Sequence, residues 1–175
     1  MQPMKPLLGA VIFAASVING AGQTAQMADR MGALDNNWVT KAAQGGLAEV
    51  ELGKLAVNRA SSDAVKQFGQ RMVDDHTRAN GELSQVAAKK GVTLPTSLDA
   101  KNQVTRDRLS KLTGAAFDRE YMSDMVKDHR ADVAEFEKEA NTGRDPDVKA
   151  FAAKTLPTLQ EHLRLAEATQ NGLKK

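Results

Sequence analysis

Hydrophobic side chains recur at steps of three and four residues along almost the whole chain after residue 36. This spacing places them on one face of an α-helix, and no stretch shows the strict alternation that is typical of a half-buried strand. Glycine and proline interrupt the pattern at a few points, notably at Gly91, Pro95, Gly114 and Gly143. The pattern therefore predicts an all-α protein.

The interruptions divide the chain into four long helices and one short helix. Ser61 and Ser62 supply a break and a cap for the second helix, and Gly91 suits the left-handed residue that ends it. Asp145 is placed to cap the last helix, with Pro146 at its first position. We expect helices at about 36–60, 63–90, 100–112, 114–141 and from 146 onward.

The lengths of the connections predict the topology. Tight turns near residues 61 and 144 would make two antiparallel hairpins, whereas the segment 91–113 is long enough to run the length of a bundle. Such a crossover gives the up-down-down-up order of a ferritin-like four-helix bundle. Pro157 lies inside the last helix and predicts a kink there, which is either tolerated or aims the next turn at a site.

The first residues have the character of an export signal. Lys5 is followed by 12 apolar residues, Leu7 to Ile18, whereas about 20 are needed to span a bilayer. We therefore expect residues 1–25 to be a removed secretory signal and residues 33–170 to form one helical domain. An uncleaved membrane anchor is the alternative. The expected location is the periplasm, with or without peripheral association with the outer membrane.

Composition excludes some partners and some sources of stability. The chain has 24 Lys+Arg and 22 Asp+Glu, so removal of Lys5 leaves 23 against 22. Without a basic stripe or many aromatic residues there is little to bind nucleic acid. The chain has no cysteine, so packing rather than disulfides must stabilise the exported protein.

Three histidines and one glutamate face the predicted core. His76 and His129 fall within the apolar stripes of their helices, and His162 flanks the stripe of the last helix. On the first helix Glu49, rather than Glu51, is the inward carboxylate. All four lie near the middle of their helices, and the midpoints of antiparallel helices share one level. We therefore expect them to meet in one cross-section.

The chemistry of these four residues suits a metal ion. A buried ionised carboxylate must be paired, protonated or bound to a metal. Three imidazoles and a carboxylate would bind zinc, iron or copper, and the core of a helical bundle is a common place for such sites. The alternative is a metal-free polar network, in which each histidine bonds a neighbouring helix and Glu49 meets a histidinium.

A repeated string adds to this interpretation. Met-Val-x-Asp-His occurs at 72–76 and at 125–129, so Met72 and Met125 each lie one helical turn before a histidine. Thioether with imidazole would favour copper(I), although methionine is also a flexible core filler.

Three aspartates accompany the predicted site. Asp75 and Asp128 lie at the stripe edges and could orient a histidine of a neighbouring helix. Asp132 lies in the same inward arc as His129.

Two further stretches stand beside the two Met-Val-x-Asp-His segments, namely KAAQGGLAEVELGKLA at 41–56 and LPTLQEHL at 156–163. Together these four stretches resemble a widespread bacterial envelope family, the domain of unknown function 4142. The resemblance covers about residues 33–170; it implies a ferritin-like fold, carries the label of an outer membrane protein and brings no established activity. A di-iron site would need Glu-x-x-His, but Val73, Val126 and Leu159 stand three residues before the histidines.

The leading hypothesis is a periplasmic bundle that binds one transition-metal ion, in metal handling or envelope stress tolerance. The alternative is a metal-free structural or interaction module with a protein partner in the envelope, because the chain has no nucleophile constellation and no phosphate loop. Catalysis is the least favoured class, since it would require an open coordination position and a reachable pocket.

Overall fold

The structure, a computed structural model, describes residues 20–174 and is all-helical over that range. The helices are α1 (Gly20–Arg59), α2 (Asp63–Lys90), α3 (Ala100–Ser110), α4 (Gly114–Thr142) and α5 (Pro146–Gly172). The all-α prediction is confirmed. The apolar core of the predicted signal, Leu7–Ile18, lies outside the described residues.

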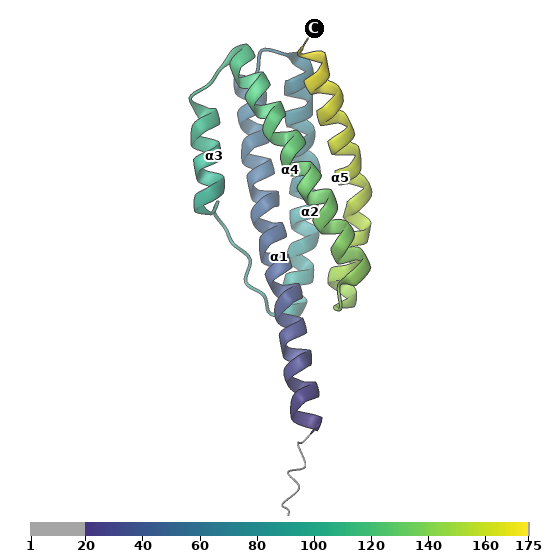
Figure 1. Ribbon diagram of the computed structural model, residues 1–175. Helices are drawn as coiled ribbons and strands as arrows, with labels where there is room; N and C mark the ends of the chain where they lie inside the picture. The colour runs from purple at the N-terminus through teal and green to yellow at the C-terminus, as the bar shows by residue number, and fades with distance from the viewer. Residues whose placement is uncertain (1–19, 175) are drawn as a thin grey trace, which may run out of the picture.

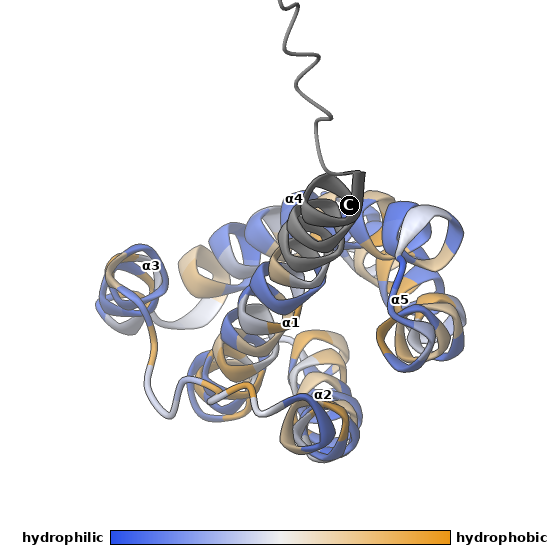
Figure 2. Cartoon of the chain, turned by 90° about the horizontal axis from the view of Figure 1, so that it is seen from below, coloured by the Kyte–Doolittle hydropathy of each residue, from blue (hydrophilic) through white to orange (hydrophobic). Residues whose placement is uncertain are grey.

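The four long helices contact one another in a ring, in the order α1, α2, α5, α4. In Figure 1, α1 and α5 run upward while α2 and α4 run downward. The short helix α3 lies over the seam between α1 and α4 and contacts both. Figure 2, seen from below, shows α3 at the edge of the assembly, outside the group of four long helices.

Helix α1 begins at Gly20, well before the start expected near residue 36. That expectation was wrong because it followed the core-facing pattern alone. Residues 20–35 are rich in alanine, glutamine and methionine and contain no proline, so helix propensity continues where the apolar stripe does not. In Figure 1 the first part of α1 projects beyond its neighbours. Within residues 20–174, no helix is long and apolar enough to cross a membrane.

Most helix ends follow the local signals in the sequence. Gly91 adopts the left-handed conformation, with φ of 67°, and ends α2. The Asp145 side chain accepts hydrogen bonds from the amides of Asp147 and Val148, with Pro146 at the first helical position. Helix α5 continues through Pro157, and the kink expected there stays a prediction.

The cap expected at the start of α2 is made differently, because the Ser62 side chain forms no capping bond. Instead Asp118, from α4, accepts hydrogen bonds from Ser61 N, Ser61 Oγ and Ser62 N at 3.1, 2.6 and 2.9 Å. At the opposite end, Asp35 of α1 accepts from two amides of the α4–α5 turn at 3.2 and 2.7 Å. Each tight turn is thus held by an aspartate of the other hairpin.

The apolar core falls into two clusters, which we name by their place in Figure 1. The upper cluster comprises Leu52, Ala56, Ala60, Val65, Phe68, Met72, Leu109, Phe117, Tyr121, Met122, Met125, Val126 and Ala166. The lower cluster comprises Val39, Ala43, Leu83, Ala87, Val148 and Phe151. Every long helix contributes to both ends of the core, with Phe136 of α4 packed against the lower cluster.

Two glycines allow α1 and α2 to approach closely beside the upper cluster. A Cβ atom on Gly53 would lie 2.6 Å from the Gly69 carbonyl oxygen, and one on Gly69 would lie 2.6 Å from the Ala56 Cβ. Real Cβ atoms do not come so close, so only glycine fits at this crossing without a shift of the backbone. The crossing lies one turn from Glu49 and therefore helps to position it.

We predict that Asp118→Ala lowers the free energy of unfolding by about 3 kcal/mol, because three hydrogen-bond donors lose a buried, charged acceptor. Urea denaturation of the purified protein measures this. Asp63→Ala is the matched control, since Asp63 is exposed at the same turn and should cost less than about 1 kcal/mol through the helix dipole. Equal losses in the two variants would contradict the role given to Asp118.

Candidate metal centre

A polar layer separates the two apolar clusters. It consists of Glu49 on α1, His76 on α2, His129 on α4 and His162 on α5, all buried. Each long helix therefore has apolar residues of the upper cluster on one side of its polar residue. On the other side it has apolar residues that belong to the lower cluster or pack against it. The layer therefore crosses the core at one level.

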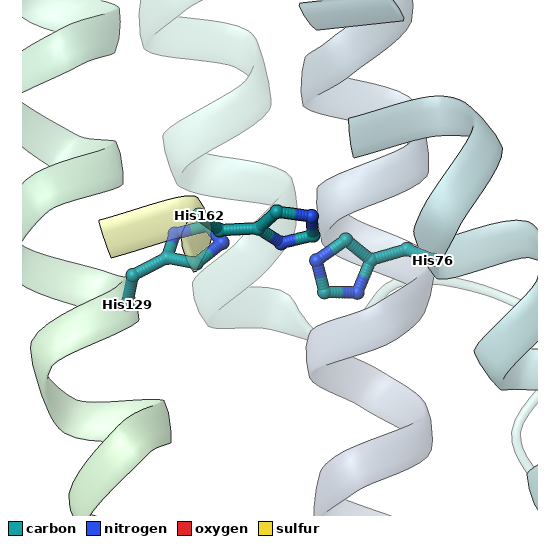
Figure 3. Close-up of side chains that lie close together, drawn as sticks. All are labelled: His76, His129 and His162. Carbon is teal, nitrogen blue, oxygen red and sulfur yellow. The ribbon is translucent and has the colours of Figure 1, made fainter. Parts of the chain in front are cut away.

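The three histidines meet at the centre of this layer. One ring nitrogen of each lies within 4.8 Å of those of the other two. Figure 3 shows the rings of His76, His129 and His162 turned toward one another from three helices. Their ring centroids are 5.3 to 5.9 Å apart. These are all the histidines of the chain, so the whole imidazole content of the protein is gathered at one point.

Hydrogen bonds fix which nitrogen of two rings carries the proton. His129 Nδ1 lies 3.0 Å from the Met125 carbonyl oxygen, which can only accept, so Nδ1 is the donor. His162 Nε2 lies 2.8 Å from Asp75 Oδ2 and donates to that carboxylate. In the neutral rings this leaves a lone pair on His129 Nε2 and on His162 Nδ1.

The nitrogens that carry these lone pairs have no partner. His129 Nε2 and His162 Nδ1 are buried without a hydrogen bond, and so is His76 Nε2. A buried acceptor that lacks a donor costs about 1–3 kcal/mol. A metal ion at the centre would give all three nitrogens a partner at once, which is the arrangement found where a histidine ligand donates its other N–H to a carboxylate or carbonyl.

The site keeps its imidazoles neutral. Burial, together with the neighbouring His129 and His162, lowers the pKa of His76 to about 3. Burial also lowers the pKa of His162 to about 4, against the opposing effect of its bond to Asp75. The pKa of His129 is lowered by burial as well. At neutral pH the rings are therefore uncharged, as metal ligands must be.

Asp75 is the charged anchor beside the histidines. Burial pushes the pKa of Asp75 upward, but hydrogen bonds from His162 and Arg78 outweigh burial and hold that pKa below its ordinary value. Arg78 and Arg71 both form ion pairs with the carboxylate, with nitrogen–oxygen distances of 2.6 and 3.4 Å. Asp75 thus stays ionised and holds the His162 ring across the α2–α5 interface, in the orienting position expected for it.

Glu49 lies beside the three histidines and is not one of that group. Its Oε1 is 3.9 Å from His129 Nδ1, the nitrogen that donates to the Met125 carbonyl, and its Oε2 is buried without a partner. Burial, together with repulsion from Asp128 and Asp124, raises the pKa of Glu49 to about 8. Glu49 and His129 are therefore a neutral pair, and the structure does not place Glu49 as a fourth member of the histidine centre.

The remaining predicted residues flank the centre. Met72 and Met125 are fully buried in the upper cluster, one turn from their histidines. Asp132 and Asp128 lie on α4 on the Glu49 side. Burial raises the pKa of Asp132 to about 7, and repulsion from Glu49 contributes. The structure thus places the aspartates of α4 with Glu49 and the methionines in the apolar core.

Tyr121 of α4 also belongs to this polar region, although the sequence analysis did not single it out. Its hydroxyl is buried without a hydrogen-bond partner. Burial, with a further contribution from Glu49, raises the pKa of Tyr121 well above its ordinary value. The signal in the sequence was its place two helical turns before His129, where a phenol enters an otherwise apolar stripe.

A cavity of about 430 Å³ reaches the polar layer from the side of the molecule that α3 covers. Its inner wall includes His76 and Glu49, and its outer wall includes Asn102 and Arg108 of α3. Asp124, which the sequence analysis also missed, lines the same cavity. The histidine centre is therefore buried but has a path toward the surface.

Comparison with known proteins gives a family and a fold. No curated protein matches this chain. Among solved structures, the crystal structure of a DUF305 fragment from Deinococcus radiodurans is similar, with a TM-score of 0.69 over 78% of this chain and 95% of that one. The two sequences are 14% identical, so the likeness shows a shared helical fold alone.

The family assignment comes from the sequence itself. The model of the family described as Domain of unknown function (DUF4142) matches residues 20–169, most of the chain. This confirms the family resemblance drawn from the repeated Met-Val-x-Asp-His segments and the motifs on the first and last helices. The chain belongs to the DUF4142 family.

Proposed function

We propose that this protein binds one transition-metal ion through His76, His129 and His162, and serves metal handling or envelope stress tolerance. The observation that carries the proposal is the set of three buried, neutral imidazoles, each with a ring nitrogen that lacks a hydrogen-bond partner and a ring nitrogen within 4.8 Å of those of the other two. The proposal includes export to the periplasm, supported by the apolar N-terminal segment, and a ferritin-like four-helix bundle. The bundle is supported by two antiparallel hairpins joined through a crossover that contains α3.

Zinc(II) is the ion that we propose first. Zinc–imidazole bonds are about 2.0–2.1 Å long, and three imidazoles with one open position are a known zinc arrangement. The ring nitrogens lie within 4.8 Å of one another, so the rings would need to move inward by only roughly 1 Å to reach such bonds. Imidazole also suits copper and iron, and the two methionines would favour copper(I) if their thioethers turned inward.

A metal-free interaction module is less well supported. A large exposed apolar patch would favour it, because such patches mark protein or membrane contacts. Among the side chains that the structure describes, Val104 on α3 is the exposed large apolar residue, at 69% exposure. A single exposed valine does not make a docking patch.

The direct test is titration of metal-free protein with zinc(II), followed by calorimetry and thermal unfolding. We expect one ion per chain and stabilisation of about 2.7 kcal/mol at a free zinc concentration of 100 times Kd. His129→Gln should lose most of this binding, whereas Thr77→Ala, an exposed neighbour of His76, should keep it. Absence of binding by the wild type with zinc(II), copper(I) and iron(II) would overturn the proposal.

Removal of one imidazole should stabilise the metal-free protein. His76→Leu replaces a buried, unpartnered acceptor with an apolar side chain, so we expect the free energy of unfolding to rise by about 1 kcal/mol in urea denaturation. His162→Leu is the comparison, because it also breaks the bond to Asp75 and should be destabilising. A loss of stability in His76→Leu would identify His76 as a structural residue and argue against the metal site.

Asp75→Asn probes the carboxylate that orients His162. The amide can still accept the N–H of His162 but lacks the charge, so zinc affinity should fall by about 10–100-fold with the stoichiometry unchanged. Competition with a chelator of known affinity measures the change. Asp74→Asn, on the exposed side of the same helix, is the matched control and should bind like the wild type; an equal fall in both variants would count against an orienting role.

A further inference from the structure

We propose that the cavity between α1, α3 and α4 is the route by which a hydrated divalent cation reaches the three-histidine centre, with a row of carboxylates as its lining. This inference rests on the proposed function and assigns a task to residues outside the histidine centre. In this proposal Glu49 and Asp132 line the inner end of the route, and Glu49 does not bind the metal in the histidine centre.

The cavity has the right connections for such a route. It has a volume of about 430 Å³, which is room for an ion with bound water. At its outer end it is lined by Asn102, Thr105 and Arg108 of α3, and at its inner end by Glu49 and His76. His76 is also the most exposed of the three histidines, at 7% against 0% and 1%. The cavity therefore leads to His76, one of the three histidines of the centre.

Carboxylates follow this cavity inward along one helix face. Asp124, Asp128 and Asp132 are spaced by one helical turn on α4, and all three line the cavity. Glu49 of α1 lines the same cavity. Its buried Oε2 has no hydrogen-bond partner, so the inner end of the row presents an unpartnered carboxyl oxygen.

The charges along the row are unevenly compensated. Arg108 of α3 pairs with Asp124 and, at 3.0 Å, with Glu120, so the outer carboxylate has a cation beside it. Lys41, Lys101 and Lys127 also line the cavity, but among the residues with described side chains no lysine or arginine forms an ion pair with Asp128 or Asp132. A cation that enters would supply the missing positive charge.

The alternative path through the apolar clusters is much less favourable. An ion that passed between tightly packed aliphatic and aromatic side chains would lose its hydration without gaining ligands, which is very costly. Carboxylates on the walls of a cleft instead focus the electric field and raise the local cation concentration. The row is therefore expected to act on the rate of metal uptake.

The test is stopped-flow mixing of metal-free protein with zinc(II), with release of zinc from a fluorescent indicator as the signal. For the double variant Asp128→Asn, Asp132→Asn we expect uptake about tenfold slower at low ionic strength, a weaker dependence on salt, and one ion still bound at saturation. Asp74→Asn is the control of the same chemistry outside the cavity. Circular dichroism should be used to check that each variant is folded.

A variant that removes a positive charge, instead of negative charges, provides an independent check. Arg108→Gln removes the cation at the outer end and should make uptake several-fold faster. Uptake by the double variant at the wild-type rate, or slower uptake in Arg108→Gln, would overturn the route while the proposed metal site stands. A wild type that takes up no zinc would overturn both.

Discussion

Three neutral imidazoles in an apolar core are the constraint on which the rest of this structure depends. Each leaves one ring nitrogen without a donor, at a cost of about 1–3 kcal/mol per nitrogen. The apolar clusters above and below must offset that cost. A shift of α2, α4 or α5 by one turn, about 5.4 Å, would place a histidine inside an apolar cluster, and the same shift of α1 would place Glu49 there. The polar layer therefore specifies the register of the four long helices.

The two turn-capping aspartates hold that register from outside the layer. Asp118 ties the α1–α2 turn to α4, and Asp35 ties the α4–α5 turn to α1. Each bond joins the two hairpins at one end of the molecule, so neither hairpin can slide along the other without losing buried, charge-assisted hydrogen bonds. The histidines lie midway between these two fixed points, which is why residues from separate helices arrive at one level.

The sequence analysis succeeded where local chemistry decides the outcome. Periodicity located the helices, Gly91 and Asp145 marked their ends, and the mid-helix positions of the histidines predicted their meeting. It failed where the outcome depends on long-range contacts or on rotation about a helix axis. Asp118 acts 56 and 57 residues away in the chain, and no local pattern reveals that. Similarly, a shared level could not show that Glu49 faces the outer edge of His129.

The separation of Glu49 from the histidines bears on the kind of metal site that we propose. Structural zinc sites are closed by four protein ligands, whereas sites that exchange or activate their fourth ligand offer three. Three histidines with a cavity beside His76 match the second kind. The apolar core packs on both sides of the histidine layer, and an aspartate ties the turn at each end, so contacts outside the centre also hold the four helices together. An ion held in this way would be cargo that can enter and leave, which favours metal handling over a structural role for the ion.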